Sequence, residues 1–314
     1  MDSTVAGGTT PADDAPPPSV RYDSSKCAEP ELADTSTMAT ISGDAIVEAV
    51  TTVFVLSTMF SMGLQLSVTQ LADALGDRRL LIRSLVVNLV AVPVVASLLV
   101  RTVPIAPAYA TGFLLLAVSP GAPFGPKFAE ISDSDIAFAS GLMALLCLLS
   151  VVTIPVSLVA LAPGDVVVDP VAIGRMVLRI QLLPLLAGLA LSSWDGSVGD
   201  RLYPPIQRLS DYSFVSLIVL LLVVYGDNMV SLVGTGTLGL SAVTVAGSLA
   251  LGYVCGGPVE ERREVLATTT AARNAAIALF IATAGFSNPD VLAVVLGFSF
   301  VSVVGAGAIA GSWR

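Results

Sequence analysis

The chain has 314 residues, of which 54% are hydrophobic and only 12% charged, and its mean hydropathy is +0.86. A soluble domain carries roughly 25% charged residues, so there are too few ions here for a water-exposed surface, whereas a lipid-facing surface needs few. The formal net charge is −9 with no basic block, which argues against a nucleic-acid partner, and histidine, the commonest acid–base group and metal ligand, is absent.

Residues 1–40 are rich in Pro, Ala, Asp, Ser and Thr, with a run of prolines at Pro16–Pro18. Such a segment cannot bury enough apolar area to offset the entropy lost on ordering, so we expect a disordered tail. No apolar core follows a basic start, so a secretory signal is not expected. Met38 is an alternative to Met1 as the initiation site.

Beyond the tail, apolar stretches recur about every 25–35 residues, and each is close to the ~20 residues that a helix needs to cross a bilayer. Gly, Pro and charged residues separate these stretches. The predicted helices cover residues 43–67, 80–101, 107–132, 135–161, 170–192, 205–230, 236–256, 261–286 and 289–312. We therefore predict an all-α, polytopic membrane protein with about nine transmembrane helices.

The distribution of Lys and Arg near the helix ends predicts the orientation, because cytoplasmic loops carry the excess of these residues. With the N-terminus outside, the cytoplasmic side holds Arg78, Arg79, Lys127, Arg201, Arg262, Arg263 and Arg314. The outer side keeps Arg21, Lys26 and Arg101, and Arg175 and Arg179 reduce the difference without reversing it. We expect a multi-pass protein of the plasma membrane with its C-terminus in the cytoplasm.

The third predicted helix is interrupted. After 108–119 the chain reads Pro120-Gly121-Ala122-Pro123-Phe124-Gly125-Pro126, which removes backbone donors and helical preference together. Non-helical backbone at membrane depth survives only where it is buried in protein or lines a cavity. The alternative is an ordinary loop between two spans, but 108–119 alone is too short to cross. We therefore predict a break inside the membrane.

The eighth predicted helix is polar in its middle, from Thr268 to Asn274. It has no proline there, so the break is inferred from polarity. An arginine as deep as Arg273 costs several kcal/mol unless a partner or water satisfies it. The alternatives are that Arg273 reaches the surface or pairs with a carboxylate. We expect Arg273 and Asn274 to face a polar cavity.

Paired interrupted helices at matching places in two halves indicate the binding site of a transporter. We predict a first repeat over 41–162, with four helices and its opening helix missing, and a second repeat of five helices over 168–314. An odd number of elements per repeat would place the two units in opposite membrane orientations. The repeats would thus be inverted.

Four segments resemble the bile acid:sodium symporter family. They are Phe60–Leu66 with Leu71–Leu75, Ser119–Ala129, Val168–Pro170 leading into Leu182–Gly188, and Arg263–Ala278. The resemblance covers about 43–312, and a nine-helix form lacking the first helix occurs in that family. It implies a core domain that holds two crossed, discontinuous helices and a panel domain against which the core moves.

The resemblance also marks departures at the sodium sites. Sodium-coupled members carry a Ser-Asn pair where this chain has Gly125 and Pro126, and hydroxyl groups where it has Ala139 and Met143. Sodium is a hard cation that prefers oxygen ligands, which these side chains lack.

The second crossover departs in the same way. Thr269 stands for a Glu of the family and Arg273 for a Gln, Asn274 is kept, and a Gln-like position in an earlier helix reads Asn88. We hypothesise that a fixed guanidinium takes the charge role of sodium, so that transport is sodium-independent or differently coupled.

The predicted substrate-binding residues are those of the two interruptions and the facing helix: Asn88, Pro123, Gly125, Pro126, Lys127, Thr268, Thr269, Arg273 and Asn274. For Lys127 an i,i+3 pair with Glu130 is an equally simple explanation. Tyr203 suits interfacial anchoring more than ligand contact. We predict no catalytic residue, no metal site and no cofactor, although sodium remains conceivable with most of its usual ligands absent.

The sequence therefore predicts a secondary transporter of a small organic anion, working by alternating access. An enzyme is not expected, because neither histidine nor paired helical carboxylates are available. A non-transporting sensor or scaffold and an arsenite-type efflux carrier are the alternatives. The arsenite carriers would place a thiol at the first crossover, whereas Cys147 belongs to the next helix. The lipid bilayer and the anion are the expected partners, and the sequence leaves the oligomeric state open.

Overall fold

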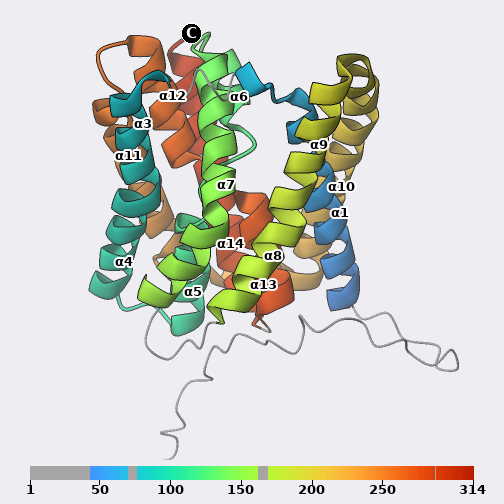
Figure 1. Ribbon diagram of the computed structural model, residues 1–314. Helices are drawn as coiled ribbons and strands as arrows, with labels where there is room; N and C mark the ends of the chain where they lie inside the picture. The colour runs from blue at the N-terminus through green and yellow to red at the C-terminus, as the bar shows by residue number, and fades with distance from the viewer. Residues whose placement is uncertain (1–42, 70–75, 162–168, 287) are drawn as a thin grey trace, which may run out of the picture.

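The computed structural model describes residues 43–69, 76–161, 169–286 and 288–314, and their regular structure is helical (Figure 1). The predicted disordered tail, Met38 and the segment Leu71–Leu75 lie outside the described residues. The predicted all-α membrane fold is confirmed.

The helices follow the expected order, with two π-helical turns, η2 and η3, inside longer helices. They are α1 (Gly43–Gln65), α3 (Arg78–Val86), η2 (Val87–Ala91), α4 (Val92–Thr102), α5 (Pro107–Ala117), α6 (Gly125–Ile131), α7 (Ile136–Leu161), α8 (Pro170–Val177), η3 (Leu178–Leu182), α9 (Leu183–Trp194), α10 (Gly196–Ser231), α11 (Thr237–Cys255), α12 (Glu260–Ala271), α13 (Ala275–Gly285) and α14 (Pro289–Ser312). Among the described residues, 8 helical runs are long and apolar enough to span a bilayer. The remaining predicted helix, 107–132, consists of the two short helices α5 and α6.

The start of α10 differs from the prediction. We expected a loop over 194–201 and a helix from 205, but α10 begins at Gly196 and runs through Pro204 and Pro205. The connection from α9 is short because Asp195 accepts a hydrogen bond from the backbone N–H of Ser197 at 2.9 Å. The two prolines keep helical geometry at the cost of the hydrogen bonds their missing N–H groups would have made.

Two groups of helices form the molecule. Helices α1, α9 and α10 pack on one another, and α7, α11 and α14 pack against the two interrupted helices, which contain α5, α6, α12 and α13 (Figure 1). The backbones of α1 and α9 touch: a Cβ added at Gly63 would lie 2.1 Å from the carbonyl oxygen of Leu185, and one at Gly188 would lie 2.4 Å from that of Phe60. The segments Phe60–Leu66 and Leu182–Gly188 therefore pack against each other.

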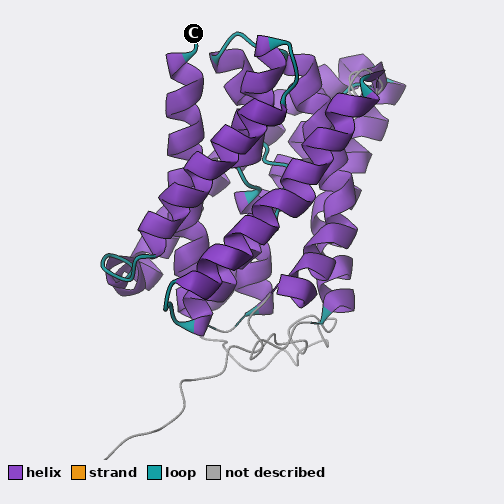
Figure 2. Cartoon of the chain, turned by 90° about the vertical axis from the view of Figure 1, so that its left-hand side faces the viewer, coloured by secondary structure: helices purple, strands orange, loops and turns teal. Residues whose placement is uncertain are grey.

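Both predicted interruptions are present. The chain is unwound at 118–124 between α5 and α6, and at 272–274 between α12 and α13. Figure 2 shows loop segments in the middle of the bundle, between helices. We call α5, 118–124 and α6 the first crossover, and α12, 272–274 and α13 the second. They meet where the N–H of Asn274 donates to the carbonyl oxygen of Ser119 at 2.9 Å.

The last helix of each predicted repeat donates a hydrogen bond to the crossover of that repeat, at or next to its unwound part. In the first half, the Cys147 thiol on α7 donates to the Gly121 carbonyl oxygen at 3.2 Å. In the second half, the Ser302 hydroxyl on α14 donates to the Ala271 carbonyl oxygen at 2.5 Å. The division into two inverted repeats stays a prediction, and the predicted boundary at 162–168 lies outside the described residues.

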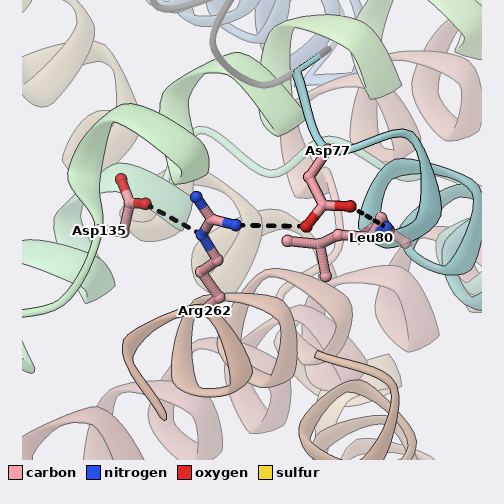
Figure 3. Close-up of polar contacts among 5 residues, drawn as sticks. Asp77, Leu80, Asp135 and Arg262 are labelled. Carbon is pink, nitrogen blue, oxygen red and sulfur yellow. Dashed lines mark hydrogen bonds and ion pairs between the residues drawn. The ribbon is translucent and has the colours of Figure 1, made fainter. Parts of the chain in front are cut away.

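Several predicted cytoplasmic cations gather at the end of the molecule that carries the C-terminus. There Arg262 at the start of α12 faces two carboxylates: Nη1 lies 3.4 Å from Asp77 Oδ2 and Nε lies 3.6 Å from Asp135 Oδ2 (Figure 3). Asp77 also accepts a hydrogen bond from the backbone N–H of Leu80 at 3.1 Å. One arginine thus joins the ends of α3, α7 and α12. We refer to this end as the inner end, following the predicted orientation.

Candidate functional site

A cavity of about 660 Å³ lies between the α1–α10 pair and the first crossover. Its lining comes from the second half of α1, the first half of α10, the start of α7 and the stretch 123–130, so the cavity belongs to the inner half of the molecule. The lining residues are Phe54, Thr58, Met62, Gln65, Leu66, Pro123, Phe124, Pro126, Lys127, Glu130, Ile136, Ser140, Met143, Tyr203, Gln207, Ser210, Asp211 and Phe214. Its size is within the usual range for small-molecule sites.

Three aromatic rings from three different elements form one apolar part of the lining. The ring centroids of Phe54 on α1 and Phe214 on α10 are 5.1 Å apart, and those of Phe124 and Phe214 are 6.5 Å apart. Aromatic rings at these separations pack favourably and offer a large apolar surface. This surface suits the hydrocarbon part of a ligand.

The helices α1 and α10 present a polar strip beside these rings. The hydroxyls of Thr58 and Ser210 share a hydrogen bond of 2.6 Å across the two helices. One turn away, the Ser61 hydroxyl donates to Gln207 Oε1 at 2.7 Å, and Gln207 Nε2 donates to Asp211 Oδ1 at 2.8 Å. The strip therefore both joins the helices and supplies polar groups to the cavity.

The charged side chains of the cavity are one lysine and two carboxylates. Lys127 Nζ lies 2.7 Å from Glu130 Oε2, and the two side chains are 64% and 60% exposed. The i,i+3 pair considered for Lys127 is thus present. Because Glu130 already pairs with the lysine and Asp211 adds a second negative charge, an anion would have to compete with Glu130 for Lys127.

The second crossover is buried. Arg273 is only 2% exposed. Its Nη1 donates to the Asn88 carbonyl oxygen at 3.1 Å, and its backbone N–H donates to the Ser302 hydroxyl at 3.3 Å. Its Nε and Nη2 have no partner among the described residues. Arg273 therefore neither reaches the surface nor pairs with a described carboxylate.

A chain of amide hydrogen bonds holds the second interruption in place. Asn274 Oδ1 accepts from the backbone N–H of Ile277 at 3.2 Å and so caps α13, while its Nδ2 donates to Gln181 Oε1 at 3.2 Å. Gln181 Nε2 in turn donates to the Cys147 carbonyl oxygen at 3.0 Å and to the Ser150 hydroxyl at 2.6 Å. The network connects α13, η3 and α7.

Gln181 and Asn88 occupy equivalent local structures, although only Asn88 was predicted as a site residue. Gln181 lies in η3, three residues before Pro184, and Asn88 lies in η2, five residues before Pro93. A proline lacks the N–H that would complete the preceding α-helical turn, and π-helical turns are frequent at functional sites. A buried amide shortly before a proline was the available sequence signal for Gln181.

The structure divides the predicted site residues into two groups. Pro123, Pro126 and Lys127 line the cavity. The others are buried outside its lining: Asn88, Gly125, Thr268, Thr269, Arg273 and Asn274. Gly125 is where these two sets of site residues come together, because a Cβ added there would lie 3.4 Å from Thr269 Oγ1. The first crossover therefore separates the cavity from the second crossover.

The sequence did not single out the α10 side of the cavity. Tyr203 was expected to be an interfacial anchor, yet it lines the cavity with Gln207 and Asp211. These three residues lie in the first half of a helix whose start was placed too late. Their spacing along one helical face was the signal available to find them.

Comparison with known proteins gives the family. A family model described as the Sodium Bile acid symporter family matches residues 52–233, more than half of the chain. The chain is 24% identical over 266 residues to the probable sodium/metabolite cotransporter BASS1, chloroplastic, of Arabidopsis thaliana, an alignment covering 82% of this chain and 65% of the relative. It is 29% identical over 147 residues to BASS3 of Oryza sativa subsp. japonica, covering 46% of this chain and 34% of the relative. The chain thus spans less than two thirds of the length of these relatives.

Proposed function

Because the chain belongs to the sodium bile acid symporter family, we propose that it is a secondary transporter that carries a small organic anion across the plasma membrane by alternating access. The observation that carries this proposal is the cavity between the α1–α10 pair and the first crossover. It lies between two groups of helices, which an alternating-access cycle would move relative to each other, and exposed Lys127 and Glu130 connect it to the inner end.

The opposite end is held by a contact between the two groups of helices. Asn228 Nδ2 on α10 donates to Asp290 Oδ1 on α14 at 2.8 Å. Just before it, Tyr225 leaves helical geometry with φ −120° and ψ 23°. An alternating-access cycle would break this hydrogen bond when the outer end opens and would close α1 and α10 onto the first crossover at the inner end.

The chemistry of the lining favours an amphipathic carboxylate or sulfonate as substrate. Its apolar part would lie on Phe54, Phe124 and Phe214, and its anionic group would take the place of Glu130 on Lys127. An exposed ion pair of this kind contributes only ~0–1 kcal/mol, so exchanging one carboxylate for another costs little.

We further propose that transport does not require sodium. Thr269 and Arg273 replace, respectively, the carboxylate and the carboxamide that the resemblance assigns to sodium-coupled members, and a guanidinium repels a second cation nearby. The names of the relatives describe those proteins as probable sodium/metabolite cotransporters. In this chain the positive charge would belong to the Arg273 side chain and not to a bound sodium ion.

The competing arsenite-type function meets a structural obstacle. The thiol of Cys147 does reach the first crossover, where it donates to the Gly121 carbonyl oxygen, but the side chain is fully buried and lies outside the cavity lining. A substrate in the cavity would therefore not contact it.

A thermal-shift screen of carboxylates and sulfonates on the purified protein tests the proposal, since a ligand that binds the folded state raises Tm. For a hit, Lys127→Gln should weaken binding about fivefold, as expected for ~1 kcal/mol, and Glu130→Gln should tighten it by a similar factor. Arg101→Gln, an exposed cation at the outer end, is the matched control. Unchanged or reversed affinities would contradict the anionic substrate, and absence of uptake into liposomes for every hit would favour the sensor or scaffold.

A further inference from the structure

The guanidinium of Arg273 has one satisfied edge and one free edge. Nη1 is used by the Asn88 carbonyl oxygen of η2, and the backbone N–H is used by Ser302 of α14. Nε and Nη2 have no partner among the described residues, although both atoms are buried. These two nitrogens lie on the same side of the planar group and point their N–H bonds in parallel, which is the geometry that binds one anion with two hydrogen bonds.

The charge of Arg273 also lacks a counter-charge in the part of the chain that the structure describes. No described carboxylate forms an ion pair with it. Glu264, a buried carboxylate on α12, accepts a hydrogen bond from the Ser134 hydroxyl. Removing an unpaired charge from water is costly, so buried charges are normally paired.

Two further side-chain atoms around the second crossover are buried and unpartnered, Thr269 Oγ1 and Asn88 Oδ1. The threonine hydroxyl can donate a hydrogen bond. Asn88 Oδ1 is an acceptor, and Asn88 Nδ2 is already used by the Ser84 carbonyl oxygen and Thr270 Oγ1 at 3.0 and 3.2 Å. The Asn88 amide therefore has no free donor for an anion, whereas Arg273 and Thr269 each keep side-chain donors without a described partner.

We propose that Arg273 binds a small inorganic anion such as chloride inside the core, with Nε and Nη2 as the principal donors and the Thr269 hydroxyl as a further one. The anion neutralises the guanidinium where a carboxylate is missing. The bound anion is separate from the transported substrate, because the first crossover lies between Arg273 and the cavity. The inference does not rest on the proposed function, since binding is measured without transport.

Equilibrium binding of radioactive chloride to the purified full chain tests the site, with gluconate replacing chloride at constant ionic strength. Saturable binding and a chloride-dependent rise in Tm are expected for the wild type and for Arg101→Gln, the matched control at an exposed cation of the outer end. Arg273→Gln should abolish both. Absence of saturable binding in the wild type, or equal binding by Arg273→Gln, would overturn the proposal.

Two milder variants keep the test decisive if Arg273→Gln does not fold. Arg273→Lys keeps the charge but loses the paired N–H groups, and its chloride affinity should fall about tenfold. Thr269→Val keeps the shape and removes the hydroxyl, and its affinity should fall several-fold. Unchanged affinity in both variants would overturn the site, as would displacement of chloride by carboxylates that bind the cavity, because the anion would then be the substrate itself.

Discussion

The two interruptions reach the same kind of break by different means. In the first, Pro120, Gly121 and Pro123 cannot continue a helix, and Gly121 has φ +84°. In the second, proline is absent, and Ala272 turns the chain with φ −76° and ψ 112° while Asn274 caps the next helix. The first break is a property of its own residues and lines the cavity. The second depends on its neighbours and is buried, so it should be the more sensitive to changes in side-chain contacts.

The largest effect is expected at Asn274. Asn274→Ala removes the cap of α13 and leaves Gln181 Oε1 without its donor, so stability should fall by roughly 2–4 kcal/mol. The matched control is Asn288→Ala, which removes the cap of α14, where Asn288 Oδ1 accepts from the Asp290 N–H at 2.9 Å, and should cost ~1 kcal/mol. Thermal unfolding in detergent measures both. Equal losses would show that the link to Gln181 adds nothing.

A substitution at Gly121 measures how far the first interruption depends on its contact with α7. A Cβ there would lie 2.8 Å from Cys147 Sγ, and φ is unfavourable for an L-residue, so Gly121→Ala should cost roughly 2–3 kcal/mol. Gly257 has a similar φ of +87° with nothing within 4 Å of the added Cβ, so Gly257→Ala should cost only ~1–2 kcal/mol. The difference in Tm between the two variants measures the contact between α7 and the crossover. If Gly257→Ala lowers stability as much as Gly121→Ala does, the backbone conformation alone accounts for the loss and the contact with Cys147 adds nothing.

The contact at the outer end should have a smaller effect on stability. Asn228→Ala removes the hydrogen bond to Asp290 and should lower stability by ~1 kcal/mol. If this contact closes the outer end, the same change should also raise the labelling rate of a cysteine introduced at Ser231. Asn288→Ala, at the N-cap of α14 and without a described contact to α10, serves as control. Loss of stability without faster labelling would leave the contact a purely structural one.

The smallest effect is expected at Arg262. Its contacts with Asp77 and Asp135 are 3.4 and 3.6 Å long and partly exposed, so Arg262→Gln should cost less than ~1 kcal/mol. The loss should shrink further at high salt, because exposed charges are screened. A loss that is large and independent of salt would mean that the three helix ends depend on this arginine.

The sequence predicted both breaks for good physical reasons. Proline and glycine act locally, so the first break could be read directly, and a buried arginine beside an asparagine indicated the second. The partners of Arg273 could not be predicted, because Asn88 and Ser302 lie far from it along the chain. The cavity was only half predicted for the same reason: Phe214 and Gln207 face it only because α10 packs on α1. The early start of α10 was also not predicted, because its first turn is marked by one hydrogen bond, from the Ser197 N–H to the Asp195 carboxylate.

We propose that the fixed guanidinium of Arg273 stands in place of a coupling ion at the second crossover, while the first crossover contacts the substrate. The most direct test is the affinity of a cavity ligand in sodium chloride and in potassium chloride of equal ionic strength. We expect the same Kd in both salts. Binding that tightens tenfold or more with sodium, in a saturable manner, would contradict it.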